Sequence, residues 1–374
     1  MTVRTTPGLP DHELPPGDND FYSSRPWLRY QMLDESTESL VVSVWSSPTQ
    51  LVAATPVYLS RTESNPLYRL EVPGIDEPVD VRTPRALVGN RRGYRGGLLL
   101  DHSREDRHDA VELLLTSIVA ECRTRGISSV WWPYLRTSEL RMMLPYAEQQ
   151  VPRLLAGDCS IHLTGSTFDD YLSSLPGSRR REISRERRVM HSASGLEIRT
   201  DPLPGLGPQL AELVHEHGRR HGSSASAHEV ATLIARQELA CGRSGWVTSA
   251  HDGQEMRSAC LSYTTADQIT VRAFGSREND RRRSAYFELA YYQQIEQAYA
   301  ISAGEVHLGI GTLRAKVLRG ARVEPLWGLR LATGTPASAT RTLTRLNREK
   351  WDRMVLEAGT DSLSDSQPDI EEWI

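Results

Sequence analysis

The sequence predicts an α/β protein of two tandem domains, each a mixed sheet flanked by helices, and three observations support this fold class. The chain has 374 residues, which is long for one small domain and sufficient for two cores. Its 39% hydrophobic and 25% charged residues are typical of a globular protein. Both halves close with the same order of elements, namely a strand, a long helix, a glycine and a second strand. Two adjacent strands joined by a helix form a parallel βαβ unit, so a duplicated α/β domain is the simplest account of that order.

The first domain is expected over residues 25–158, after a flexible arm over 1–24 that is rich in proline, glycine and aspartate. Apolar periodicity predicts strands over 40–45, 51–59 and 98–100, a helix over 104–125 and a buried strand over 127–134. The apolar face of the helix is expected to consist of Val111, Leu114, Leu115, Ile118, Val119 and Cys122.

The second domain is expected over residues 159–332, and a C-terminal helix with an acidic tail over 333–374. Its opening resembles a capping box, because Ser166 and Thr167 each stand three residues before an aspartate. The remaining pattern predicts helices over 179–188, 206–217, 228–240, 284–301 and 342–356, and strands over 246–250, 257–264, 268–274 and 306–310.

Several classes of protein are disfavoured by what the chain lacks. No apolar run approaches the roughly 18 residues of a membrane span, and the proline-rich opening offers no signal-peptide core, so a cytoplasmic protein without membrane contact is expected. Four scattered cysteines and the histidines at 215, 217, 221 and 228 lack ligand-like spacing, so neither a metal nor a tightly bound cofactor is expected. A net charge of −4 argues against a general nucleic-acid binder and leaves room for a local basic face.

Lysine is scarce in this chain. Lysine and arginine together number 44, yet only Lys316 and Lys350 are lysine. Because an arginine cannot replace the compact, titratable ammonium of lysine, a lone lysine inside a motif requires an explanation.

The helix over 179–188 carries Arg181, Arg185 and Arg188 on one stripe. Three guanidinium groups in a row suit phosphates, which they bind through paired hydrogen bonds. The alternative is a solvated face braced by Glu182 and Glu186 at helical spacings. Both interpretations stay open from the residues alone.

The second half resembles the Fem-like, peptidoglycan-biosynthesis-related branch of the GNAT acyltransferase superfamily. The resemblance covers about residues 165 to 330, and weaker similarity in the first half rests on Gly93-Tyr94 and on 130–135. It depends on the segments 168–175, 179–188, 220–222, 286–289, 308–311 and 316–320.

Such a resemblance implies two GNAT-like domains facing a cleft and a lysine at the donor carbonyl, just after the penultimate strand of the second domain. Lys316 is the matching position, and Arg319 lies three residues on, on the same face of a helical turn. The family pattern normally has an aromatic residue before that lysine, whereas this chain has Ala315. We expect the acceptor to meet Tyr94, Trp132, His221 and Glu288.

The donor is less well defined by the sequence. CoA-dependent GNAT enzymes bind the pyrophosphate on a glycine-rich loop that opens a helix, but no glycine follows Gly275 before Ser284 here. Side-chain cations would then have to replace the backbone. The expected donor-binding residues are Arg319, Arg181, Arg185, Arg188, Arg281, Arg282, Arg283 and Ser284.

Three functions follow in order of preference. The first is an N-acyltransferase that moves an aminoacyl group from the acceptor end of a tRNA to the amine of a small metabolite or peptide, with Lys316 at the developing oxyanion. The second is an N-acetyltransferase that uses acyl-CoA in the same cleft. The third is a non-catalytic GNAT-like module that binds cell-wall or nucleic-acid fragments.

Overall fold

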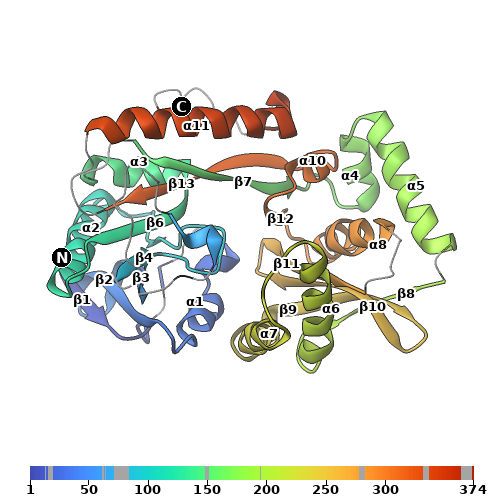
Figure 1. Ribbon diagram of the computed structural model, residues 1–374, viewed down its shortest axis with the longest axis horizontal. Coiled ribbons are helices and arrows are strands. Elements are labelled where there is room, and N and C mark those ends of the chain that lie inside the picture. The colour runs from blue at the N-terminus through green and yellow to red at the C-terminus, as the bar shows by residue number, and fades with distance from the viewer. Residues whose placement is uncertain are drawn as a thin grey trace. The chain divides into compact units, whose positions relative to one another are not determined.

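The structure is a computed structural model (Figure 1). It describes residues 1–12, 14–15, 20–60, 63, 65–70, 84–147, 151–193, 195–277, 283–331, 337–363 and 373–374. In 192–193, 283–284 and 337–339 only the backbone is described. The chain divides into two compact units, unit 1 over 1–158 with 323–374, and unit 2 over 159–322. Both are mixed α/β, so the predicted fold class is confirmed.

Unit 1 is a mixed sheet that contains both antiparallel pairs and a parallel pair. Its helices and 3-10 turns are η1 (Phe21–Ser23), α1 (Arg25–Met32), η2 (Pro66–Tyr68), α2 (Arg107–Thr124), α3 (Thr137–Met143), η3 (Leu144–Tyr146), α11 (Ala337–Ala358) and η6 (Thr360–Ser362). Its strands are β1 (Thr2–Thr6), β2 (Glu38–Ser47), β3 (Gln50–Ser60), β4 (Arg85–Val88), β5 (Leu99–Leu100), β6 (Ser129–Arg136), the first part of β7 (Arg153–His162) and most of β13 (Arg322–Arg330). Their order is β1-β2-β3-β4-β6-β13-β7, with β5 beside β3.

The parallel pair of unit 1 differs from the expected one. We expected the strand over 98–100 to lie beside the strand that follows α2, but β6 pairs in parallel with β4, which the sequence pattern did not reveal. The short β5 instead pairs antiparallel with β3. Within the segment expected to be an arm, β1 pairs antiparallel with β2.

Helix α2 of unit 1 buries the apolar face that the sequence predicts. It buries every expected residue of its apolar face except Val119, which is half-buried. These side chains pack at helical spacing against the sheet, where α2 contacts β2 and β3.

Unit 2 also contains a parallel pair of strands. Its helices and turns are α4 (Phe168–Ser174), α5 (Gly177–Ala193), α6 (Gly207–Arg220), α7 (Ala227–Cys241), η4 (Gly242–Ser244), α8 (Arg283–Phe287), the π-turn η5 (Glu288–Tyr292), α9 (Gln293–Ala300) and α10 (Leu313–Val317). Its own strands are β8 (Glu197–Pro202), β9 (Gly245–Asp252), β10 (Glu255–Thr264), β11 (Gln268–Ser276) and β12 (Glu305–Ile310). The order is β7-β12-β11-β10-β9-β8, in which β11 and β12 are parallel.

The connection from β11 to β12 is the long helix that the sequence predicts over 284–301. The structure divides it into α8, η5 and α9, so a single π-turn interrupts the α-helical pattern. Such π-turns are rare and frequently mark functional sites.

Candidate active site

The candidate site of unit 2 lies where β11 and β12 separate. Three residue pairs join them, the last being Thr270 with His307, and β11 then continues to Ser276 while β12 continues to Ile310. The residues of β11 beyond Thr270 include half-buried side chains from 271 to 274. Openings at the carboxyl ends of parallel strands are common ligand sites.

An irregularity in β11 accompanies the separation. The register with β10 shifts where Leu261 faces Ala273 and Ser262 faces Val271, so Arg272 is the extra residue on the β11 side. A bulge of this kind bends a strand and redirects its side chains. The bend therefore falls next to the point where β12 departs.

Lys316 is a residue of α10, and its side chain reaches back to the end of β12. Its ammonium donates hydrogen bonds to the carbonyls of Gly309, at 2.6 Å, and Ile310, at 3.0 Å, and the residue is only 4% exposed. The chain reaches α10 through a tight turn, in which Gly311 (φ 79°) and Thr312 (φ 52°) both have left-handed backbone. Left-handed backbone is rare for a threonine, and such strain concentrates at functional sites.

Arg319 follows α10, and its guanidinium nitrogens donate hydrogen bonds to groups of the protein. Its Nη2 donates to both oxygens of Glu186 at 2.8 Å, its Nε to the Tyr292 hydroxyl at 2.9 Å, and its Nη1 to the Ala315 carbonyl at 2.9 Å. The guanidinium carbon lies 3.3 Å from the centre of the Phe287 ring. Burial opposes its charge, yet the pKa of Arg319 is raised by Tyr292 and Glu186.

Glu288 is the first residue of the π-turn and has no exposed surface. Its carboxylate accepts hydrogen bonds from Arg187, at 3.2 and 3.3 Å, and from Gln293, at 2.8 Å, and it lies 3.2 Å from His191 Nε2. The pKa of Arg187 is raised, because Glu288 and Glu296 outweigh its burial. Glu288 thus joins α5 to the π-turn.

The basic helix α5 has two distinct faces. Arg181, Arg185 and Arg188, which were expected to bind the donor, are all exposed, whereas Ile183 and Met190 are buried. These three arginines are called the α5 stripe below. Of the other expected donor residues, Arg281 and Arg282 lie outside the described residues, and the side chains of Arg283 and Ser284 are not described.

The expected acceptor residues occupy different environments. Trp132 is fully buried in unit 1 and its indole donates to the Gly96 carbonyl at 2.6 Å, whereas Tyr94 is half-buried. His221 is exposed in unit 2, with its ring centre 4.5 Å from that of His217. Burial, helped by the charges of His221 and Arg220, lowers the pKa of His217 to about 4.

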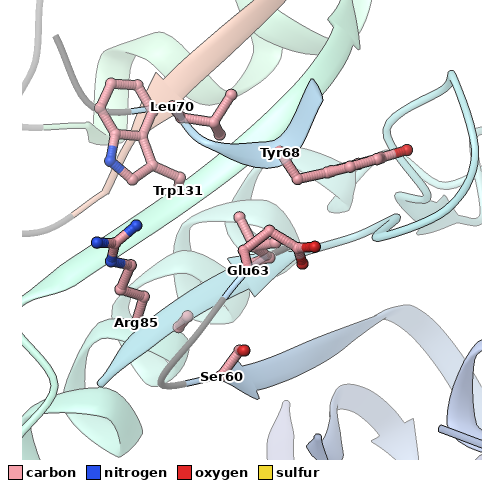
Figure 2. Close-up of a pocket in the computed structure, with 8 residues that line it drawn as sticks. Ser60, Glu63, Tyr68, Leu70, Arg85 and Trp131 are labelled. Atoms are coloured by element: carbon pink, nitrogen blue, oxygen red, sulfur yellow. The ribbon is translucent and has the colours of Figure 1, made fainter. Parts of the chain in front are cut away.

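Unit 1 contains a pocket of its own, shown in Figure 2. Trp131 lines this pocket, and its buried indole N–H has no hydrogen-bond partner in the described part of the chain. The adjacent Trp132 does not line it. The other lining residues are Ser60, Glu63, Tyr68, Leu70, Arg85, Ala86 and Leu87.

Sequence reasoning missed the residues that surround Arg319. Glu186 stands inside a charge run that was interpreted as a stripe for phosphates or a solvated face. Tyr292 was expected only as part of a helix, and Phe287 as part of that helix and of the segment 286–289 on which the resemblance depends. No spacing rule connects Glu186, Phe287 and Tyr292 with Arg319, because these residues meet only in the tertiary structure. Across the described residues, no three histidine, cysteine or acidic side chains are grouped to hold a metal ion, and no described helix is long and apolar enough to cross a bilayer.

Comparisons with known proteins agree with this architecture. The family model FemAB-like, described as peptidoglycan biosynthesis/recognition, matches residues 92–354. The solved structure of FemX aligns with a TM-score of 0.60 at 10% identity, covering 86% of this chain and 94% of FemX. L-PGS from Bacillus licheniformis aligns with a TM-score of 0.51 at 9% identity, covering 91% of this chain and 99% of that one.

A third solved structure is a tandem GNAT protein from the clavulanic acid biosynthesis pathway. It aligns with a TM-score of 0.50 at 12% identity, covering 89% of this chain and all of that one. At such identities these likenesses show the fold alone. No curated protein sequence matches the chain.

Proposed function

This chain belongs to the FemAB-like family, and from that premise we propose that it is an N-acyltransferase that takes an aminoacyl group from aminoacyl-tRNA and forms an amide on a small metabolite or peptide. The observation that carries the proposal is the buried ammonium of Lys316 at the end of β12, past the last residue pair that joins β12 to β11. Lys316 is one of two lysines in the chain, and it is the sequence position that the resemblance matches to the lysine at the donor carbonyl.

The reaction needs no redox step. The neutral amine of the acceptor attacks the ester carbonyl, a C–N bond forms, and the carbonyl oxygen becomes an oxyanion. Collapse of this intermediate breaks the ester C–O bond and releases the ribose hydroxyl of the tRNA, which takes up the proton that the amine loses. The Lys316 ammonium stabilises the oxyanion, and one such donor contributes about 3–4 kcal/mol to the transition state.

The donor is proposed to meet the α5 stripe. Its three guanidinium groups are exposed on one face, which suits phosphates spaced along a ribose-phosphate strand. Arg281, Arg282, Arg283 and Ser284 remain proposed donor contacts on sequence grounds. Arg319 does not, because Glu186, Tyr292 and Ala315 occupy its donors.

Two of the four expected acceptor residues keep exposed surface. They are Tyr94 in unit 1 and His221 in unit 2, and each remains a proposed acceptor contact on sequence grounds. Trp132 and Glu288 are instead fully buried and hydrogen-bonded within the protein. We therefore reassign Trp132 and Glu288 from acceptor contacts to supports of the surrounding structure.

An acyl-CoA-dependent N-acetyltransferase is the second candidate. The exposed α5 stripe would bind the phosphates of coenzyme A as readily as those of a tRNA.

One assay separates the candidates. The protein is incubated with total tRNA, the synthetases, ATP and isotope-labelled amino acids, together with a panel of diamines, amino acids and dipeptides, and amides are detected by mass spectrometry. We expect labelled amides that disappear when ribonuclease is added first. Turnover that persists with ribonuclease, or with acetyl-CoA alone, supports the second candidate. If neither donor gives a product, the remaining candidate is the non-catalytic binding module.

A further inference from the structure

Helix α10, which carries Lys316, is too short to fix its own position. It spans five residues, Leu313–Val317, between the left-handed Thr312 and Gly320 (φ 84°). Isolated helices of this length are unstable, so tertiary contacts must hold it in place. Where the ammonium sits therefore depends on what fastens α10 to the rest of unit 2.

The side chain of Arg319, just after α10, connects this helix to the rest of unit 2. Three segments converge on its guanidinium, with Glu186 from α5, Tyr292 from the π-turn and Phe287 from α8. Tyr292 also donates a short hydrogen bond to Glu186, which closes the cluster. Arg319 is 5% exposed, and all three nitrogens of its guanidinium donate to groups of the protein.

Arg319 is linked to Lys316 through the backbone of the same turn. The Arg319 amide donates to the Lys316 carbonyl at 2.9 Å, and the Arg319 carbonyl accepts a hydrogen bond from the Tyr171 hydroxyl at 2.9 Å. Gly320, next in the chain, packs so closely that an added Cβ would lie 2.7 Å from a Leu175 methyl. Both ends of the Arg319 residue are thus fixed, and with them the turn that carries Lys316.

We propose that Glu186 and Tyr292, acting through Arg319, are positioning residues that hold the Lys316 ammonium at the end of β12. This inference rests on the proposed function of Lys316 and adds residues that touch neither substrate. Loss of either partner leaves Arg319 with an unmatched donor, which lets α10 shift. A displacement of about 1 Å at a catalytic group can cost up to about a hundredfold in rate.

The first test observes Lys316 directly and needs no substrate. Because the chain has only two lysines, selective ¹³C-lysine labelling gives two sets of side-chain signals, and Lys350→Arg identifies that of Lys316. We expect Glu186→Gln and Tyr292→Phe each to move the Lys316 Cε–Hε signal. Tyr292→Phe removes a single hydroxyl, so it keeps the test valid if Glu186→Gln fails to fold.

Two matched controls come from α5 and from α9, the helix that follows the π-turn. Glu182→Gln removes another carboxylate of α5, one that pairs with Arg179 at the surface. Tyr299→Phe removes a hydroxyl that donates to the Thr164 carbonyl. Both should leave the Lys316 signal in place. An unmoved signal in folded Glu186→Gln and Tyr292→Phe would overturn the proposal.

The second test is kinetic and uses the donor and acceptor found by the mass-spectrometric assay. The two variants should lower kcat by about ten- to a hundredfold and change the KM for the donor by less than about twofold. A raised donor KM with unchanged kcat would instead make Arg319 a donor-binding residue. If the unmodified protein turns over no donor, the proposed function fails, and the lysine signals still decide the positioning role.

Discussion

At the scale of single residues, the two buried cations of this turn differ in the groups to which they donate hydrogen bonds. Arg319 and Lys316 stand three residues apart, and both are buried. The guanidinium donates to Glu186, Tyr292 and Ala315, whereas the ammonium of Lys316 donates to the backbone carbonyls of Gly309 and Ile310 at the end of β12. A compact point charge suits an oxyanion, and a planar fork suits a fixed carboxylate, which accounts for the two residue types in one turn.

Removing the ammonium tests the catalytic role. Lys316→Ala should lower kcat by about 10²–10³-fold, because one oxyanion donor is lost. Lys316→Arg should recover little of that rate, since the larger guanidinium cannot take the position of the ammonium. Lys350→Arg is the control for lysine substitution elsewhere. A folded Lys316→Ala variant with unchanged kcat would place the chemistry at another residue.

A second residue-scale prediction concerns pH. The pKa of His217 is lowered to about 4 from the usual 6.5, chiefly by burial, so the folded state binds fewer protons than the unfolded chain between these values. Stability is therefore fully present above about pH 6.5 and falls as the pH drops towards 4. His217→Gln should flatten this slope in urea unfolding, and His228→Gln, at an exposed position, should not. Equal slopes in all three proteins would contradict the assignment.

At the scale of elements, the periodicity of the sequence predicted what local patterns can encode. The helix over 104–125 was recovered as α2 because its apolar face repeats at helical spacing. Strand β4 was missed because it is only four residues long, too short to show alternation. The π-turn was hidden inside the helix predicted over 284–301, since one irregular turn leaves most of the apolar spacing intact.

The charged helix α5 shows that the local sequence does not reveal which charged side chains have partners far away in the chain. Its sequence was interpreted as one basic stripe, and the three stripe residues are indeed exposed. Glu186 and Arg187, however, face inward and bind Arg319 and Glu288. These partners lie 133 and 101 residues away along the chain, so nothing in the local sequence could distinguish a solvated carboxylate from one that clamps a buried arginine.

The packing of α6 on β11 gives a prediction at this scale. A Cβ added to Gly275 would lie 2.5 Å from the backbone of Leu213 and of Val214, which cannot move without shifting the helix. Gly275→Ala should therefore destabilise the fold by about 1–3 kcal/mol in chemical denaturation. Gly304→Ala is the matched control, because nothing lies within 4 Å of its added Cβ. A loss below about 0.5 kcal/mol for Gly275→Ala would show that this contact is looser than the structure has it.

At the scale of the whole molecule, the distribution of charge matters more than its sum. The net charge is −4, which repels polyanions in general, yet the α5 stripe presents three arginines on one exposed face. A nucleic acid that binds here is therefore expected to make few phosphate contacts and to bind with modest affinity. Its acceptor end, and not its whole length, is the part that this surface suits.

The salt dependence of tRNA binding measures those contacts. Each neutralised phosphate releases condensed counterions, so the logarithm of the association constant falls with that of the salt concentration by about 0.7 to 0.9 per contact. The stripe alone should contribute about 2 to 3 to this slope, measured by filter binding of uncharged tRNA between low and physiological salt. Arg181→Ala with Arg185→Ala should reduce the slope by about 1.5 and weaken binding, because two guanidinium groups are lost. Arg345→Ala removes an exposed arginine of α11 that pairs with Glu349, and should leave the slope unchanged. If the double variant binds tRNA with the original slope, the stripe is a solvated face and the donor phosphates bind elsewhere.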